Sequence, residues 1–353
     1  MSAVLEAIDL VKHFPVATGV FGRRSALVRA VDGVSLSVDA GATFAIVGES
    51  GCGKSTLARL LLRLLEPTAG TVHLEGEDLA RLSAPALRAA RARLQIVFQD
   101  PYGSLNPRMT VEAMLDEPLR LHGVVPPAGR AQRIVALLAL VGLRRDAALR
   151  YPHEFSGGQR QRIAIARALA SEPRVIVCDE PVSALDVSIQ AQILNLLADL
   201  QRRFGLAFVF ISHDLAVVRQ IATRIAVMYL GRFVETGTAE DVFARPLHPY
   251  TRALLSAVPV PVVRERVRGP VTGGDVPSPL APPTGCHFHP RCPHAVERCQ
   301  HAVPGVETEG TRTVACHRWR EIETATSALP KRGHNPALIR LQAAFAAQSA
   351  RTE

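Results

Sequence analysis

Short apolar runs alternate with amphipathic stretches along most of the chain. Buried parallel strands are predicted by three runs bounded by polar residues: GATFAIVG, RVIVCDE and LAFVFISHD. Helices are predicted by the apolar spacing of KSTLARLLLRLL and SIQAQILNLLADLQRRF. Strands that alternate with helices predict an α/β fold around a parallel sheet.

Three regions depart from this alternation. The stretch VDGVSLSVDAG predicts an antiparallel strand and a turn before the core. Residues from about 101 to 155 are punctuated by proline and mainly helical in pattern, so we expect a helical subdomain there. After residue 246, a short helix in HPYTRALLSAVPVPVV leads into RGPVTGGDVPSPLAPPTG, a predicted linker or extended loop. We therefore expect a domain at 1–246, a C-terminal extension at 247–325 and a tail at 326–353.

The composition restricts the class of protein. With 353 residues and 48% hydrophobic positions, the chain has room for two domains and a large core. No run of 18 apolar residues predicts a membrane-spanning helix, and MSAVLEAIDLVKHF lacks the basic start and apolar core of a secretory signal. We therefore expect a cytosolic chain. The net charge of +9 forms no basic stripe interleaved with aromatic residues, so no nucleic-acid partner is expected.

The stretch GESGCGKST lies between a predicted strand and a predicted helix and fits G-x-x-x-x-G-K-[ST]. A chance glycine-rich turn would not need this context. The glycines let successive backbone N–H groups curl around phosphates. Lys54 would reach the β- and γ-phosphates, the Ser55 hydroxyl would bind Mg²⁺, and Cys52 would fill the turn as a small side chain. The expected nucleotide-binding residues are Gly48, Glu49, Ser50, Gly51, Cys52, Gly53, Lys54, Ser55 and Thr56.

Two further motifs accompany this loop. In VIVCDE, an apolar strand ends in Asp179, which would hold Mg²⁺, and Glu180, which would deprotonate the attacking water. Taken alone, an acidic pair that caps the next turn fits equally well. In FSGGQRQRIAIARAL, Ser156 is a natural helix N-cap followed by two glycines. One nucleotide does not need this second anion-binding helix start, which suggests a nucleotide held by another subunit.

Together these motifs resemble the ATP-binding subunits of ABC transporters, with Phe155 replacing the leucine of the family's LSGGQ signature. The resemblance identifies Gln99 of IVFQD with the Q-loop glutamine, SALD with the D-loop, and His213 of ISHD with the switch histidine at the γ-phosphate. It also identifies Phe14 of KHFPV with the aromatic residue that stacks on adenine. The implied catalytic residues are Glu180, His213 and Gln99, and the implied Mg²⁺ ligands are Ser55, Gln99 and Asp179.

The resemblance implies an ATPase that works as a head-to-tail dimer. Each ATP would lie between the glycine-rich loop of one subunit and the signature of the other. ATP binding would close the dimer and hydrolysis would reopen it, while the helical subdomain carries this motion to permeases. The signature residues that would contact the nucleotide are Ser156, Gly157, Gly158 and Gln159.

Longer stretches resemble one branch, the ATPases of oligopeptide/dipeptide-type importers. They are KHFPVATGVFGRR, IVFQDPYGSLNPRMTV, DEPVSALDVSIQAQILNLL and HPYTRALLSAVP, within about residues 3 to 320. The resemblance implies an ATPase that drives the import of peptides or a related solute. The ATPase would lie at the cytoplasmic face of the inner membrane. Its partners would be a second related ATPase subunit in a heterodimer, two permease subunits and an external substrate-binding protein. The alternative is an exporter ATPase or a non-transport ABC ATPase, but an exporter would not need the HPY extension.

Four cysteines, Cys286, Cys292, Cys299 and Cys316, lie in a polar, proline-rich segment with little core to bury them. Disulfides are not expected in the cytosol, and the spacing fits neither common zinc sites nor ferredoxins. The residues alone leave isolated thiols or an unnamed metal open. Some importers of this branch carry a [4Fe–4S] cluster in this region, so the resemblance predicts such a cluster here, with Zn²⁺ second. The alternative ligands are His287, His289, His294, His301 and His317.

Overall fold

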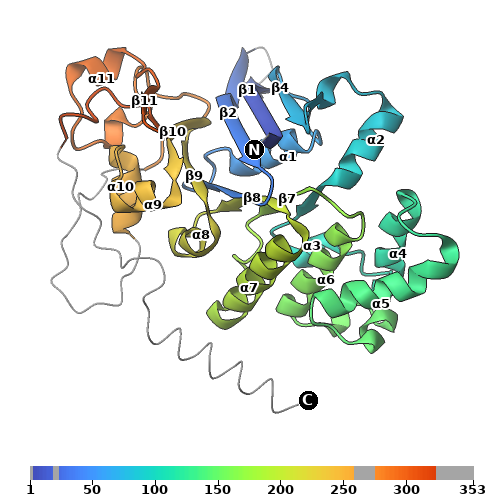
Figure 1. Ribbon diagram of the computed structural model, residues 1–353. Coiled ribbons are helices and arrows are strands. Elements are labelled where there is room, and N and C mark those ends of the chain that lie inside the picture. The colour runs from blue at the N-terminus through green and yellow to red at the C-terminus, as the bar shows by residue number, and fades with distance from the viewer. Residues whose placement is uncertain (1–2, 19–23, 258–274, 323–353) are drawn as a thin grey trace.

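The computed structural model describes residues 3–18, 24–257 and 275–322, and it contains two sheets with helices packed against them (Figure 1). The expected α/β architecture is confirmed. The predicted tail at 326–353 lies outside the described residues. In the described part of the chain, no helix combines the length and the apolar character that a membrane crossing needs.

The main sheet has the strand order β11-β12-β10-β9-β3-β8-β7-β6. Its strands from β9 to β6 are parallel, whereas β10 pairs with β9 in the antiparallel direction. The three predicted apolar runs form β3, β7 and β8, and every residue of these strands is buried because helices or the second sheet cover both faces. The strands are β3 (Thr43–Val47), β6 (Leu94–Val97), β7 (Val175–Asp179), β8 (Ala207–Ser212), β9 (Arg224–Tyr229), β10 (Arg232–Thr238), β11 (Glu307–Glu309) and β12 (Arg312–Val314).

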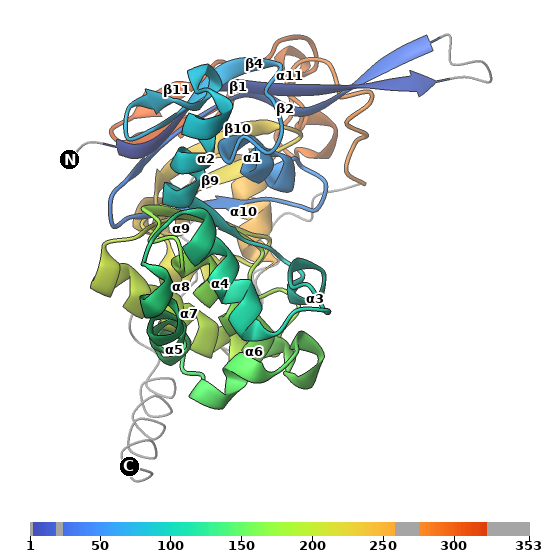
Figure 2. The ribbon, with the colours of Figure 1, turned by 90° about the vertical axis from the view of Figure 1, so that its right-hand side faces the viewer.

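A second, antiparallel sheet has the order β2-β1-β4-β5. The expected antiparallel strand around VDGVSLSVDAG forms the second half of β2, which pairs with β1 along nearly its whole length. Figure 2 shows this pair extending beyond the rest of the molecule. The strands are β1 (Ala3–Thr18), β2 (Arg24–Asp39), β4 (Ala69–Leu74) and β5 (Glu77–Asp78).

The helices largely follow the apolar periodicity. One difference is α1, which ends at Leu61, whereas the pattern KSTLARLLLRLL continues to Leu65. The chain leaves the helix here, and Arg63 adopts a positive φ of 48°. The helices are α1 (Lys54–Leu61), α2 (Ala84–Arg93), α3 (Pro101–Ser104), α4 (Val111–Leu121), α5 (Arg130–Leu140), α6 (Gly157–Leu169), α7 (Val187–Phe204), α8 (Leu215–Ile221), α9 (Ala239–Ala244), α10 (Pro249–Ser256) and α11 (Glu297–His301).

The segment from 101 to 155, for which a helical subdomain is predicted, contains α3, α4 and α5. Figure 1 shows these helices grouped with α6 and α7 on one side of the molecule, away from β11 and α11. Buried apolar residues of α4, α5 and α6 belong to the same core cluster as residues of β3 and β8. The helical group is therefore packed continuously with the main sheet.

The chain after residue 246, called the C-terminal region below, continues the main sheet. Its strand β12 pairs with β10, and β11 pairs with β12. The carboxylate of Glu235 in β10 is fully buried, accepts a hydrogen bond from Arg312 in β12 at 2.7 Å, and accepts two more from the backbone N–H groups of Leu247 and His248. This buried ion pair links the C-terminal region to the α/β core.

Candidate nucleotide-binding site

Four segments with predicted chemistry follow the carboxyl ends of neighbouring parallel strands. Residues 48–56, called the P-loop below, follow β3, and His213 follows β8. Glu180 follows β7 and Gln99 lies two residues after β6. Because the strand order is β3-β8-β7-β6, these segments meet along one edge of the sheet. In open α/β sheets, this edge is where ligands bind.

The P-loop follows β3, and its backbone conformation requires glycine at Gly48 and Gly53. A Cβ atom at Gly48 would lie 2.2 Å from the carbonyl oxygen of Met228. At Gly53, which has a φ of 109°, a Cβ atom would lie 2.0 Å from the carbonyl oxygen of Ala30. Gly53 also forms the N-cap of α1, so the loop ends where the positive end of a helix begins.

Lys54 is turned back into the P-loop. Its ammonium group donates to the carbonyl oxygens of Gly48 at 2.7 Å and Glu49 at 2.9 Å, and the side chain is buried. The Cys52 side chain is also buried beneath the loop, and burial raises the pKa of its thiol. Cys52 therefore fills the turn as a neutral small group, and the ammonium group lies in the ring of backbone that the motif forms around phosphates.

Ser55 and Asp179 meet at the start of α1. The Ser55 hydroxyl donates to Oδ1 of Asp179 at 3.1 Å. Burial raises the pKa of the Asp179 carboxyl, and the hydrogen bond from Ser55 opposes this effect. A hydroxyl oxygen beside a carboxylate fits the preference of Mg²⁺ for oxygen ligands.

Glu180 is held by two polar side chains. Its Oε2 atom accepts a hydrogen bond from Nε2 of Gln99 at 3.1 Å and lies 3.0 Å from Nδ1 of His213. Glu180 has a φ of 48°, a left-handed conformation that is uncommon for a residue with a side chain. Such strain often occurs at functional sites. The structure thus brings together the three predicted catalytic residues, which lie 114 positions apart in sequence at most (213 − 99).

The signature motif forms the start of α6. The Ser156 hydroxyl accepts from the backbone N–H of Gln159, and the Gln159 side chain accepts from the backbone N–H of Ser156. This reciprocal arrangement is a capping box. Gly158 packs so closely on α7 that a Cβ atom would lie 2.5 Å from a methyl carbon of Ile189, whereas Gly157 has more room. Ser156 and Gln159 are exposed.

The signature and the P-loop lie in different parts of the subunit. Figure 2 shows α1 beside the antiparallel sheet and α6 in the helical group at the opposite end of the view. The structure therefore brings the P-loop together with Glu180, Gln99 and His213, but it does not bring Ser156 to the same place.

Phe14 lies in β1, on the side of the P-loop where β2 approaches it. It pairs with Val28 of β2, two residues before Ala30, whose carbonyl oxygen abuts Gly53. The Phe14 ring is partly exposed, and the ammonium group of Lys12 lies 5.2 Å from its centre. An aromatic face is therefore available on the strand pair that adjoins the loop.

The prediction of a [4Fe–4S] cluster at the four cysteines is wrong. Among residues 3–18, 24–257 and 275–322, no group of three or more His, Cys, Asp or Glu side chains could hold a metal ion. This finding also removes the zinc alternative. The four cysteines line one small cavity of about 10 Å³, together with His289, His294 and His317. A cavity of that size has room for about one water molecule.

Burial disfavours the thiolate form of three of the cysteines at this cavity. Burial raises the pKa of Cys286 to about 11 and that of Cys316 to about 12, and it also raises the pKa of Cys292. Cys299 is buried, and the other three cysteines are partly buried. The C-terminal region therefore buries these cysteines in packing, where free cysteine behaves as a small apolar residue.

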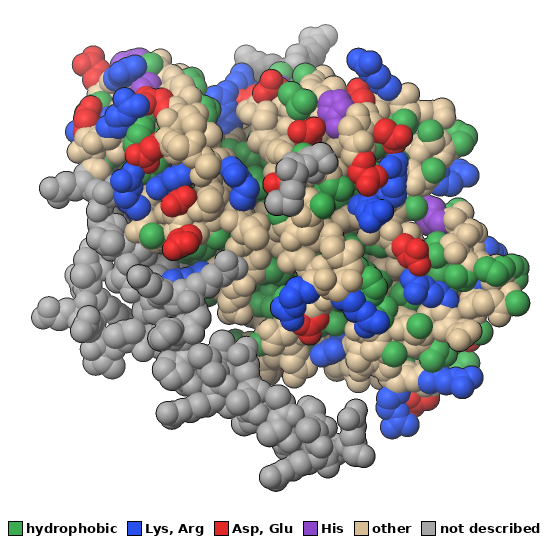
Figure 3. Space-filling view, viewed as in Figure 1, with side chains coloured by type: hydrophobic (Ala, Val, Ile, Leu, Met, Phe, Trp, Pro, Cys, Tyr) green, Lys and Arg blue, Asp and Glu red, His purple; other side chains and the backbone are tan. Residues whose placement is uncertain are grey.

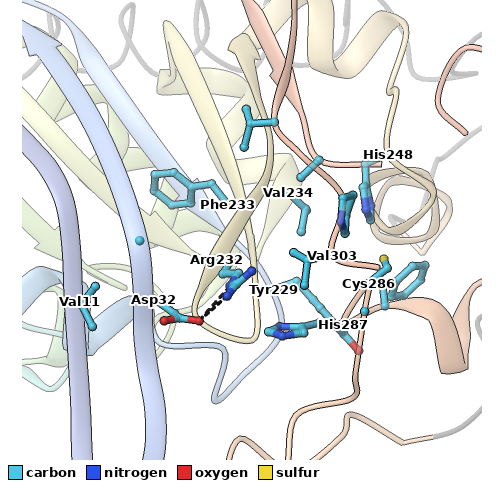
Figure 4. Close-up of a pocket in the computed structure, with 16 residues that line it drawn as sticks. Val11, Asp32, Tyr229, Arg232, Phe233, Val234, His248, Cys286, His287 and Val303 are labelled. Carbon is cyan, nitrogen blue, oxygen red and sulfur yellow. Dashed lines mark hydrogen bonds and ion pairs between the residues drawn. The ribbon is translucent and has the colours of Figure 1, made fainter. Parts of the chain in front are cut away.

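A larger cavity, of about 380 Å³, lies between the antiparallel sheet, β10 and the C-terminal region. Figure 4 shows the ion pair of Asp32 with Arg232 on one side and His287 and Cys286 on the other. Burial lowers the pKa of His287. Since no P-loop residue lines this cavity, it is separate from the predicted nucleotide site.

Charged side chains are mixed on the face of the molecule shown in Figure 3. Lys and Arg side chains alternate there with Asp and Glu side chains. The net charge of +9 thus does not form a single positively charged patch on this face.

Sequence reasoning missed two residues that contact the P-loop. The Tyr250 hydroxyl accepts a hydrogen bond from the backbone N–H of Glu49 at 2.9 Å. Arg291 donates to both carboxylate oxygens of Glu49, at 2.7 and 2.8 Å. The HPY and HPR triplets that contain them are visible in the sequence, but no local pattern indicates contacts across about 200 residues or more.

Two family models match the chain. The model described as ABC transporter matches residues 31–183, which include the P-loop, Gln99, the signature motif and Glu180. The model described as oligopeptide/dipeptide transporter, C-terminal region, matches residues 234–299. The second match includes Tyr250 and Arg291.

The curated relatives are similar over most of their length. The oligopeptide transport ATP-binding protein AppF of Bacillus subtilis is 51% identical over 89% of this chain and 97% of its own length. The dipeptide transport ATP-binding protein DppF of Escherichia coli is 51% identical over 89% of this chain and 93% of its own. These names describe ATP-binding proteins and mention no iron–sulfur cluster.

Solved structures resemble the α/β part of the chain. The dimeric ATP-binding cassette MJ0796 bound to ADP and Pi has a TM-score of 0.59 and 29% identity, over 67% of this chain and 98% of that one. CbiO1 from Clostridium perfringens has the same TM-score at 26% identity, over 69% of this chain and 91% of that one. The chain therefore belongs to the ABC transporter family, among the ATP-binding proteins that carry the oligopeptide/dipeptide transporter C-terminal region.

Proposed function

We propose that this protein hydrolyses ATP to drive the import of peptides, or of a related small solute, by an ABC importer. The observation that carries the proposal is the convergence of Glu180, Gln99 and His213 beside the P-loop, at the carboxyl edge of the main sheet. The match to the oligopeptide/dipeptide C-terminal region and the names of the curated relatives support the peptide branch over an exporter or a non-transport ATPase.

In this proposal, the P-loop binds the phosphates of ATP through its backbone N–H groups and the ammonium group of Lys54. The carbonyl contacts that Lys54 makes would be exchanged for phosphate oxygens. Ser55, Gln99 and Asp179 would hold Mg²⁺, which spreads the phosphate charge when it is bound. Phe14 would stack on adenine from the adjoining strand.

Glu180 acts as the general base in the proposed mechanism. A carboxylate held by two side chains is fixed in direction, and one of its oxygen atoms can accept the proton of a water molecule lined up with the γ-phosphate. Gln99 and His213 orient the carboxylate, and the exposed His213 ring would also contact the γ-phosphate. Product release then restores the contacts of Glu180.

The proposed assembly contains two ATPase subunits, two permeases and an external substrate-binding protein at the inner membrane, with this chain on the cytoplasmic side. The second ATPase subunit is a different, related chain. Its Ser156 counterpart would complete the site at this P-loop, and the exposed Ser156 to Gln159 turn would complete the partner's site. A helix start with an exposed serine is suited to bind a phosphate in this way.

The first test is Glu180→Gln in the full-length protein. We expect ATP binding to persist and hydrolysis to fall about a hundredfold or more, because the amide cannot accept the proton. Nucleotide binding and phosphate release are measured separately, and Asp214→Asn, outside the proposed set, serves as the control. Turnover at the wild-type rate in Glu180→Gln would contradict the assigned base.

A further inference from the structure

Glu49 of the P-loop is held at three points, two of them by the C-terminal region. Its backbone N–H donates to the hydroxyl of Tyr250, and its carboxylate accepts two hydrogen bonds from Arg291. The third point is its carbonyl oxygen, which accepts a hydrogen bond from Lys54. A residue inside the predicted phosphate-binding loop is therefore fixed by side chains about 200 residues or more away in sequence.

The Arg291 side chain that contacts Glu49 is itself held in place by aromatic rings. Its side chain is only 7% exposed, and its guanidinium lies 5.9 Å from the ring centres of both Tyr229 and Phe288. Phe288 is buried and packs edge-on against Tyr229, with ring centres 5.4 Å apart, and against Tyr250 at 5.3 Å. This aromatic cluster joins β9, α10 and the segment that carries Arg291, so the same packing positions the guanidinium and the Tyr250 hydroxyl.

The contact between Arg291 and Glu49 affects ATP binding because Glu49 is negatively charged. A free carboxylate at the second position of the P-loop would repel the phosphates that the loop binds. The paired hydrogen bonds from Arg291 neutralise this charge in a geometry that only an arginine provides. The side chain of Glu49 is 29% exposed, so loss of the pair would leave a partly buried charge beside the phosphates.

We propose that Arg291 and Tyr250, called the P-loop brace, are positioning residues through which the C-terminal region sets the affinity for ATP. The brace neutralises Glu49 and fixes the backbone at the entrance to the loop. The proposal rests on the nucleotide site proposed above. The brace gives the C-terminal region a role in nucleotide binding. Any partner or deformation that moves Arg291 away from Glu49 would leave the Glu49 carboxylate unpaired at the P-loop.

The test compares ATP binding by four full-length proteins: the wild type, Arg291→Gln, Glu49→Gln and the double variant. Arg291→Gln should raise the Kd and KM for ATP about tenfold, because Glu49 is left unpaired, with a smaller change in kcat. Glu49→Gln in the Arg291→Gln background should restore the affinity, because it removes the repelling charge. Loss of stability alone would not be reversed by the second change in this way.

Arg291→Lys and Arg245→Gln are the matched comparisons. Arg291→Lys keeps the charge without the paired geometry, so its Kd should lie between those of the wild type and Arg291→Gln. Arg245→Gln removes an exposed ion pair with Glu309 of the C-terminal region and should leave ATP affinity unchanged. An unchanged Kd in Arg291→Gln, or a raised Kd that the double variant does not restore, would overturn the proposal.

Two further variants keep the test decisive. Tyr250→Phe preserves the packed ring but removes the acceptor for the Glu49 N–H, so it should weaken ATP binding a few-fold. This result can be obtained even if Arg291→Gln does not fold. Wild-type affinity in Tyr250→Phe would count against the brace. Lys54→Ala should abolish ATP binding whether or not the brace exists. If Lys54→Ala bound ATP normally, the proposed nucleotide site would fail, which is a different result from failure of the brace.

Discussion

Asp179 illustrates, at the scale of one residue, how a site can oppose the stability of the fold. Its carboxyl is buried at the end of β7, and burial raises its pKa because the charged form has lost water. Ionising this carboxyl in the folded protein therefore costs free energy, which the hydrogen bond from Ser55 offsets in part. The proposed Mg²⁺ would give the charged form a cation when nucleotide is bound.

Asp179→Asn should therefore stabilise the nucleotide-free protein and abolish its ATPase activity. The expected gain is about 0.5–2 kcal/mol in the free energy of unfolding at neutral pH. Because the folded pKa is raised, the native state binds the proton more readily than the unfolded chain, so lowering the pH toward the folded pKa should favour the wild type and narrow the difference. Chemical denaturation at several pH values checks this, and a variant less stable than the wild type at neutral pH would contradict it.

The attachment of the C-terminal region is decided at the scale of strands and helices. Strands β11 and β12 are three residues each, ETE and RTV, and they join the main sheet through β10. So few ladder hydrogen bonds do not hold a strand by themselves. The fully buried carboxylate of Glu235 and the guanidinium of Arg312 add an ion pair that is shielded from water.

Arg312→Ala should destabilise the protein by about 3–5 kcal/mol, because it leaves the Glu235 carboxylate buried without its cation. Arg245→Ala, which breaks the exposed pair with Glu309, should cost less than about 1 kcal/mol. Both are measured by urea unfolding of the full-length chain. Equal losses in the two variants would show that burial of Glu235 does not govern the attachment.

The molecule as a whole keeps apart the P-loop and the signature turn, which are the two halves of the proposed nucleotide site. The P-loop, Glu180 and His213 meet at the sheet edge, while the signature turn belongs to the helical group at the other end of the view in Figure 2. Two subunits placed head to tail would unite them. The separation favours a dimer over a single subunit as the unit that hydrolyses ATP.

Ser156→Arg should therefore impair the nucleotide site of the partner rather than its own. The Ser156→Arg variant of this chain is mixed with an unmodified partner ATPase subunit and exposed to a photoreactive ATP analogue. Mass spectrometry then measures how much of the analogue is attached to the P-loop of each subunit. Labelling of the partner should fall while labelling of this chain persists; Lys54→Ala should give the reverse. Because loss of the Ser156 N-cap costs about 0.5–2 kcal/mol, thermal unfolding is recorded for each variant. Loss of labelling at the chain's own P-loop would contradict the exchange between subunits.

The α/β core and the segments that carry the chemistry follow from local patterns in the sequence. Each of these segments is local: an apolar run ends, and the residues of the motif follow at once, as the P-loop follows β3 and Glu180 follows β7. Burial of every residue in β3, β7 and β8 makes such strands readable as continuous apolar runs. The order of the motifs was therefore enough to identify the family.

The contacts that the C-terminal region makes with the core depend on packing between distant elements. The contact between Arg291 and Glu49 spans 242 residues, and its energy comes from burial and geometry that no local pattern records. The [4Fe–4S] cluster that the resemblance predicted was wrong for the same reason, because neither the resemblance nor the four cysteines in the sequence reveal that their shared cavity holds only about one water molecule. Local periodicity specifies elements, whereas the space and charge between distant elements are fixed only when they pack.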